Sequence, residues 1–125
     1  MAKFSMTAPG SFSETATKSL MDQYRGIVAT RYQPCSHTQI LTTIKSSAFV
    51  VSRKYDGELW YLVTAGSDSK LVAANGRVVT GAHPILDGAS KLASGLLLAG
   101  ELYVPADKGR ERVGDVSQAL ANGGA

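Results

Sequence analysis

The sequence has few of the residues that build covalent or metal-bound frameworks. Among its 125 residues there are one cysteine, Cys35, and two histidines. A single cysteine excludes a disulfide within the chain, and this set is too small for the usual zinc sites of four Cys and His ligands. An ordinary hydrophobic core must therefore hold the fold, and nothing in the composition indicates an oxidising compartment.

Long hydrophobic runs are also missing. No apolar stretch approaches the roughly 20 residues that a membrane-spanning helix needs, and residues 1–13 lack the apolar core of a secretory signal. Internal repeats and low-complexity tracts are absent as well. We therefore expect a soluble, cytoplasmic protein with no membrane partner.

What the sequence does contain is typical of one globular domain. It is 44% hydrophobic and 18% charged, with a formal net charge of +3. This mild positive charge permits a nucleic-acid partner but does not argue for one, because phosphate-binding surfaces usually show clustered Lys and Arg. The nearest such cluster is Lys108, Arg110 and Arg112, which a solvated loop explains equally well.

The chain begins with a segment that has no periodic pattern. Residues 1–12 are mostly small or polar, and Pro9 and Gly10 interrupt them. Such a composition predicts a flexible tail. We therefore place the domain at residues 13–125.

Two helices are predicted to follow. Ser11 and Glu14 have the spacing of a capping box, and apolar residues then recur every three or four positions as far as Val28. This is the period of one helical face. Ser36 and Gln39 repeat the capping-box spacing and predict a second, shorter helix.

The rest of the chain has the character of strands. Residues 49–51 form a short apolar run and residues 59–63 are aromatic and β-branched, so both are expected to be strands joined through residues 54–57. Asn75 and Gly76 separate two further apolar segments and predict a hairpin with a two-residue type I′ turn.

A last strand and a last helix complete the expected order. Residues 96–104 predict the strand, and residues 116–121 predict a short helix that Asn122 and two glycines end. Helices followed by several strands and a final helix indicate an α+β fold, with an antiparallel sheet and N-terminal helices.

The sharpest chemical signal is the run that contains Lys54, Asp56 and Gly57. A lysine that ends an apolar strand can lose solvation, and a deprotonated lysine can attack phosphorus or a carbonyl carbon. The acid two residues later could orient the amine or help to bind a metal. A turn with a surface lysine and aspartate explains the same four residues, because short patterns recur by chance.

A second signal is Glu101, which lies inside the apolar run of residues 96–104 and follows Gly100. Strand alternation could place its carboxylate in solvent. A carboxylate next to a glycine in an otherwise apolar strand is also a way to present a metal ligand.

Taken together, these segments resemble motifs of the covalent nucleotidyltransferases, a family of ATP-dependent DNA ligases, RNA ligases and messenger-RNA capping enzymes. The segments, in the family's order, are Lys54-Tyr55-Asp56-Gly57, Asn75-Gly76 and Gly100-Glu101. The tyrosine after the lysine and the strand after Gly100 favour the DNA ligase branch. The resemblance covers about residues 30–120.

The resemblance implies the N-terminal part of an adenylation domain, with a partial nucleotidyltransferase (ATP-grasp-like DNA ligase) fold. Lys54 would be the catalytic nucleophile that takes AMP from ATP, and Glu101 would bind Mg²⁺. AMP would then pass to the 5′-phosphate of nicked duplex DNA before strand sealing, a reaction of DNA replication, recombination and repair. The residues implied to contact the nucleotide are Ser52, Arg53, Asp56, Gly57, Arg77 and Glu101.

The chain departs from the family pattern at several positions. The family usually has Glu at the position of Ser52, where it contacts adenine, and Arg at the position of Leu59. Ala73-Ala74 replace Ser-Arg before the hairpin turn, and Ala99 replaces Asp before Gly100-Glu101. These replacements are typical either of a divergent branch or of a degraded site.

The family's later motifs and its OB-fold domain do not occur in these 125 residues. The resemblance therefore predicts that the chain alone is inactive in sealing, and that a C-terminal continuation or a partner chain supplies what is missing. Two alternatives stay open. The chain could belong to an RNA ligase or a capping-type nucleotidyltransferase, or it could be a non-catalytic relic or nucleic-acid-binding module.

Overall fold

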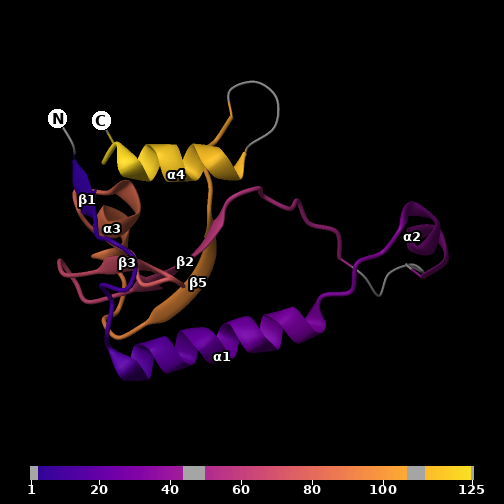
Figure 1. The fold of residues 1–125 in the computed structure, drawn as a ribbon, viewed down its shortest axis with the longest axis horizontal. Coiled ribbons are helices and arrows are strands. Elements are labelled where there is room, and N and C mark those ends of the chain that lie inside the picture. Colours follow the sequence, from indigo (N-terminus) through magenta and orange to yellow (C-terminus); the bar gives the residue numbers. More distant parts are fainter. Residues whose placement is uncertain (1–2, 44–49, 107–111, 125) are drawn as a thin grey trace.

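The computed structural model describes residues 3–43, 50–106 and 112–124. Five strands form one antiparallel sheet in the order β1-β4-β3-β2-β5 (Figure 1). The strands are β1 (Phe4–Met6), β2 (Glu58–Val63), β3 (Lys70–Ala73), β4 (Val78–Gly81) and β5 (Leu97–Leu102). The helices are α1 (Thr15–Arg31), α2 (His37–Thr43), α3 (Pro84–Ala89) and α4 (Val113–Ala121). This α+β architecture confirms the predicted fold class.

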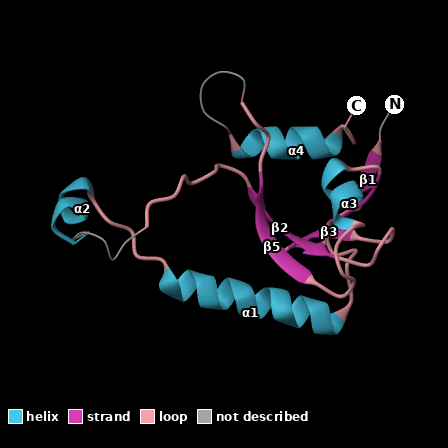
Figure 2. Cartoon of the chain, turned by 180° about the vertical axis from the view of Figure 1, so that it is seen from behind, coloured by secondary structure: helices cyan, strands magenta, loops and turns pink. Residues whose placement is uncertain are grey.

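Helices cover both faces of the sheet. In both ribbon views α1 crosses one face, here called the α1 face, while α3 and α4 lie against the other, the α4 face (Figures 1 and 2). Successive strand residues point to opposite faces, so Trp60 packs in the core on the α4 face and Tyr61 in the core on the α1 face. Both side chains are almost completely buried.

Residues 3–12 of the predicted tail are packed against the domain in the structure, and residues 1–2 lie outside the described residues. Phe4–Met6 pair with β4 as an edge strand, and Phe12 is buried in the core of the α1 face. Between them, the N–H of Thr7 donates to the carbonyl of Val78 at 2.9 Å. Backbone pairing and one buried aromatic ring hold the segment, and neither produces a periodic sequence pattern.

The two helix starts had different outcomes. Ser36 and Gln39 form the predicted capping box, with reciprocal hydrogen bonds of 2.9 and 3.2 Å. The capping box predicted at Ser11 does not form, because the Ser11 hydroxyl donates to the carbonyl of Ala8. Glu14 caps α1 without a side-chain hydrogen bond to the backbone.

The hairpin forms at the predicted place with a different turn. The N–H of Gly76 donates to the carbonyl of Ala73, and the N–H of Ala73 donates to the carbonyl of Arg77. The loop therefore has three residues, Ala74 to Gly76, and is not a two-residue type I′ turn. Gly76, at φ 88°, takes the left-handed position that follows such a three-residue turn.

A strand was predicted over residues 49–51. Phe49 lies outside the described residues, and the other two residues form no strand. Val50 and Val51 are 95% and 89% exposed and belong to no strand. A strand needs a neighbour to satisfy its backbone, and no described segment pairs here. Lys54 therefore does not close a strand, and β2 begins only at Glu58. In the described ranges, no helix has both the length and the apolar character needed to span a bilayer.

Candidate functional site

The two predicted motifs meet where β2 begins and β5 ends. β2 and β5 are antiparallel neighbours, and their register pairs Leu59 with Glu101. Just before β2, the backbone N–H of Gly57 donates to the Glu101 carboxylate at 3.1 Å. Residues 44 positions apart in the sequence are thus joined directly.

A second contact holds the lysine segment against the end of β5. The rings of Tyr55 and Tyr103 stack with their centroids 4.4 Å apart, and the Arg53 guanidinium lies 4.7 Å from the Tyr55 centroid. Stacked rings and a cation over a ring each contribute about 0.5–1 kcal/mol at exposed positions. The residues on both sides of Lys54 are therefore positioned.

Lys54 and Ser52 are both exposed and belong to no helix or strand. Asp56 and Gly57 are half-buried. Three residues of extended chain span at most about 10–11 Å, so Lys54 is tethered within that distance of Gly57. The lysine side chain lines neither of the two cavities that Glu101 borders.

Gly57 has a structural reason to be glycine. A Cβ atom at this position would lie 2.0 Å from the carbonyl oxygen of Leu102 and 3.1 Å from the Cβ of Tyr103. Backbone atoms of a paired strand cannot move away without breaking the pairing. The glycine of the lysine motif is therefore required for the close approach of β5.

We expect Gly57→Ala to destabilise the protein by about 1–3 kcal/mol, the usual cost of inserting a methyl group where there is no room. Urea unfolding monitored by the fluorescence of Trp60 measures this change. Gly26→Ala is the matched control, because a Cβ there meets nothing within 4 Å and alanine favours the interior of α1. Equal effects of the two substitutions would contradict the close approach.

Sequence reasoning missed Glu58, which organises a polar cluster on the α4 face. Its Oε2 accepts from the Trp60 indole at 3.0 Å and from the Arg77 guanidinium at 3.3 Å, and its Oε1 accepts from the Ser117 hydroxyl at 2.7 Å. The Arg77 guanidinium also lies 5.0 Å from the centroid of the Trp60 ring. Glu58 directly follows the lysine motif in the sequence, but its hydrogen-bond partners depend on strand register and on how α4 packs against the sheet.

The structure does not bring Arg77 together with Glu101. Arg77 contacts Glu58 and Trp60 on the α4 face, whereas Glu101 is paired with Leu59, which belongs to the core of the α1 face. Side chains of paired residues share a face. Of the predicted nucleotide contacts, Arg77 therefore stands on the opposite side of the sheet from Glu101.

The surroundings of Glu58 lower its pKa. Burial alone would raise the pKa of this carboxyl, but hydrogen bonds from Ser117 and Trp60 and the charge of Arg77 outweigh burial. The folded state thus binds the Glu58 proton less tightly than the unfolded state does. Its contribution to stability is present above the unfolded pKa of about 4.3 and is lost as the pH falls through the lower, folded pKa.

We expect Glu58→Gln to lower the free energy of unfolding by about 1–2 kcal/mol at pH 6, because charge-assisted hydrogen bonds become neutral ones. The difference from the wild type should shrink below about pH 4, where the wild-type carboxyl takes up its proton. Urea titrations between pH 3 and 6 measure both effects, with the exposed Glu14→Gln as control. A difference that does not change with pH would show that the charge is not involved.

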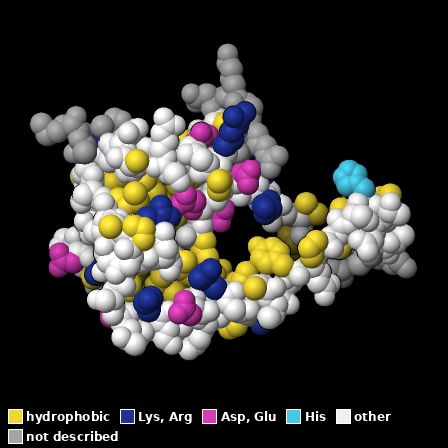
Figure 3. Space-filling model, in the orientation of Figure 1, with side chains coloured by type: hydrophobic (Ala, Val, Ile, Leu, Met, Phe, Trp, Pro, Cys, Tyr) yellow, Lys and Arg dark blue, Asp and Glu magenta, His cyan; other side chains and the backbone are white. Residues whose placement is uncertain are grey.

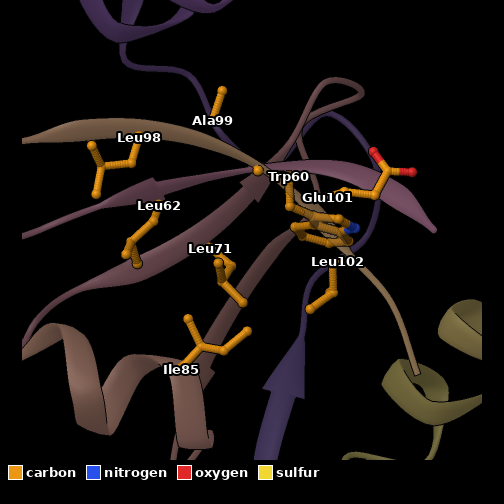
Figure 4. A pocket seen from close by; sticks show the side chains of 9 residues that line it. Trp60, Leu62, Leu71, Ile85, Leu98, Ala99, Glu101 and Leu102 are labelled. Carbon is orange, nitrogen blue, oxygen red and sulfur yellow. The ribbon is translucent and has the colours of Figure 1, made fainter. Parts of the chain in front are cut away.

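Two cavities border Glu101, one on each face. The smaller, of about 190 Å³, lies on the α4 face between the sheet and Ile85 of α3 (Figure 4). Its lining is almost entirely apolar, and Figure 4 shows the Glu101 carboxylate pointing away from it. This cavity is therefore a gap in the packing rather than a place for polar chemistry.

The larger cavity, of about 520 Å³, lies on the α1 face between α1 and the β2–β5 pair. The space-filling view shows an opening above α1, with hydrophobic and basic side chains at its rim (Figure 3). The lining residues are Tyr24, Arg25, Val28, Ala29, Tyr32, Leu59, Gly100 and Glu101. The contribution of α1 to this cavity has no counterpart among the motifs found in the sequence.

Metal binding has only one predicted ligand here. In the segments that the structure describes, no group of three or more His, Cys, Asp and Glu side chains is arranged to hold an ion. Mg²⁺ commonly binds through one or two carboxylates together with waters and substrate phosphates, so Glu101 fits that mode only with a phosphate present. Lys108 and Arg110 of the basic cluster lie outside the described residues.

The arrangement places an anchored lysine segment, a carboxylate and an aromatic cavity at one end of the sheet. Such a set can hold a ligand that has an aromatic ring and hydroxyl groups, beside a tethered amine.

No protein-family model matches this chain, and neither a curated protein nor a solved structure matches it.

Proposed function

We propose that this chain is the nucleotide-binding part of a covalent nucleotidyltransferase of the ATP-dependent DNA ligase type. The observation that carries the proposal is the hydrogen bond from the Gly57 N–H to the Glu101 carboxylate. It joins the two segments that the family resemblance assigns to one site.

The strand order gives further support. The lysine segment leads into β2, the hairpin of β3 and β4 follows, and β5 returns to pair with β2. Neighbouring strands could have been arranged so that Glu101 was far from the lysine. The α1-face cavity beside Glu101 is also of a size that suits a nucleotide, since small-molecule pockets are about 300–1,000 Å³.

In the proposed reaction Lys54 is the nucleophile. Its neutral amine forms a bond between Nζ and the α-phosphorus of ATP, the bond to pyrophosphate breaks, and the amine proton passes to solvent. AMP is then linked to the lysine as a phosphoramidate and moves to the 5′-phosphate of a DNA nick. The attack needs a deprotonated amine, so the exposed position of Lys54 has to be covered when ATP is bound.

Glu101 has two roles in this proposal. It accepts the Gly57 N–H and so fixes the start of β2, and its negative charge attracts Mg²⁺ that accompanies the triphosphate. Bound Mg²⁺ supplies charge neutralisation at the phosphates. Positioning and charge neutralisation dominate phosphoryl-type transfers, so a single lysine and a single carboxylate give slow transfer.

The test is protein labelling with Mg²⁺ and α-labelled ATP or GTP, followed by denaturation and mapping of the labelled residue by mass spectrometry. We expect AMP on Lys54, formed slowly by these 125 residues. Each missing electrostatic contact can cost about 10²–10³ in rate, so a longer product that carries the family's later motifs should label much faster.

The nucleotide arms separate the possible outcomes. Label from ATP on Lys54 supports the ligase type, and preferential label from GTP supports the capping type. Label on a different residue, or no label even in a product that carries the later motifs, would contradict the proposal.

A further inference from the structure

The α1-face cavity has features that the proposed function does not use. Tyr24 and Val28 lie one turn apart on the C-terminal half of α1, and Tyr32 is the residue with extended backbone that ends the helix. Arg25 and Ala29 form the adjacent stripe and line the same space. Together, α1 and the residue that ends it contribute two aromatic rings and one cation to a cavity whose other wall is the sheet.

The sheet wall is chemically different from the helix wall. Leu59 and Gly100 provide an apolar floor, and Glu101 places a carboxylate at its edge. Gly100 pairs with Trp60, whose side chain lies on the α4 face, so Gly100 presents only its backbone to the α1-face cavity. Arg25 on the helix wall and Glu101 on the sheet wall carry opposite charges, so the cavity favours a ligand that has both negative charge and hydrogen-bond donors.

Packing accounts for only part of this arrangement, because Tyr24 meets the buried Tyr61 ring edge to face, with the centroids 5.9 Å apart. Met21 is the buried side chain of α1, while Tyr32 is 71% exposed and Tyr24 is 40% exposed. Packing against the sheet would favour the burial of these rings. Their exposure beside a cavity is what a stacking surface for a flat aromatic ligand requires.

We infer that α1 forms the second wall of a nucleoside-monophosphate site, in which Tyr24 and Tyr32 contact the base and Arg25 binds phosphate. The hydroxyl groups of the ribose then donate to Glu101. This inference rests on the proposed function for the identity of the ligand, and it goes beyond it by assigning binding to three residues outside every motif.

The experiment is equilibrium dialysis of the full chain with AMP and with adenosine, neither of which reacts with Lys54. Arg25→Gln should weaken AMP binding about tenfold, the loss expected for one charge-assisted contact, and leave adenosine binding unchanged. Tyr32→Ala should weaken both ligands. Arg31→Gln is the matched control, because it removes the same charge from the same helix outside the cavity lining.

The outcomes distinguish this inference from the proposed function. AMP binding that is undetectable, or equal in Arg25→Gln, Tyr32→Ala and wild type, overturns the inference even if Lys54 is labelled by ATP. AMP binding that responds as expected supports the inference even if no residue is ever labelled. Circular dichroism should show α1 retained in every variant.

Discussion

Lys54→Arg is expected to reduce AMP labelling of the protein by at least about 10³-fold, because removing a nucleophile leaves only what binding and positioning contribute. Arginine keeps the positive charge and the length of the side chain. Its guanidinium stays protonated in proteins and cannot attack phosphorus. The substitution therefore separates nucleophilicity from charge.

The measurement is labelled protein after denaturation, compared over time with the wild type and with Lys70→Arg. Lys70 lies in β3, where its ammonium is near the Phe12 ring on the α1 face, so its replacement tests the general effect of changing a lysine. Because Lys54 is exposed, its replacement should leave thermal unfolding unchanged. Labelling of Lys54→Arg at the wild-type rate would mean that another residue is the nucleophile.

Glu101→Gln is expected to slow AMP labelling by about 10²-fold, the lower end of the cost of losing one electrostatic contact with reacting phosphates. Glutamine has nearly the same shape, and its carbonyl oxygen can still accept the Gly57 N–H. The anchoring of the lysine segment is therefore kept while the negative charge is removed. Glu101→Ala removes both.

Comparing the two variants distinguishes the roles of Glu101. If the carboxylate only anchors Gly57, Glu101→Gln should label like the wild type and Glu101→Ala should be slow. If its charge matters, both should be slow, and raising the Mg²⁺ concentration should partly restore Glu101→Gln. Glu14→Gln, in which an exposed glutamate at the start of α1 is changed, serves as the control.

The sequence predicted most elements of this fold because their signals are local. The aromatic and β-branched run of β2 and the apolar period of α1 are contained in consecutive residues, and both elements form. β1 was not predicted because its three residues become a strand only through pairing with β4. The apolar residues Val50 and Val51 have no such partner in the described structure and stay exposed.

The candidate site also combines features that local signals predict with features that depend on distant residues. The proximity of Gly57 to Glu101 could be expected from the order of the motifs, although only the β2–β5 register shows it. The engagement of Arg77 by Glu58 could not be expected, because it depends on which face each side chain occupies. The contribution of α1 to the cavity depends on how a helix far from the motifs docks, and no local pattern encodes that.

The few contacts between α1 and the sheet should affect how often the helix is docked, and therefore how tightly a ligand binds. The buried Met21 side chain, the hydrogen bond from the Tyr61 hydroxyl to the Met21 carbonyl and the edge-to-face contact of Tyr24 with Tyr61 connect this helix to the sheet. Because these contacts are few, we expect α1 to leave the sheet in local openings that cost far less than global unfolding. Its amide protons should then exchange with solvent sooner than those of β2 and β3. An undocked helix provides no second wall, so the apparent dissociation constant of a ligand is the intrinsic value divided by the docked fraction. Saturating ligand would in turn slow amide exchange along α1, and the helix would report occupancy of the site through its own protection.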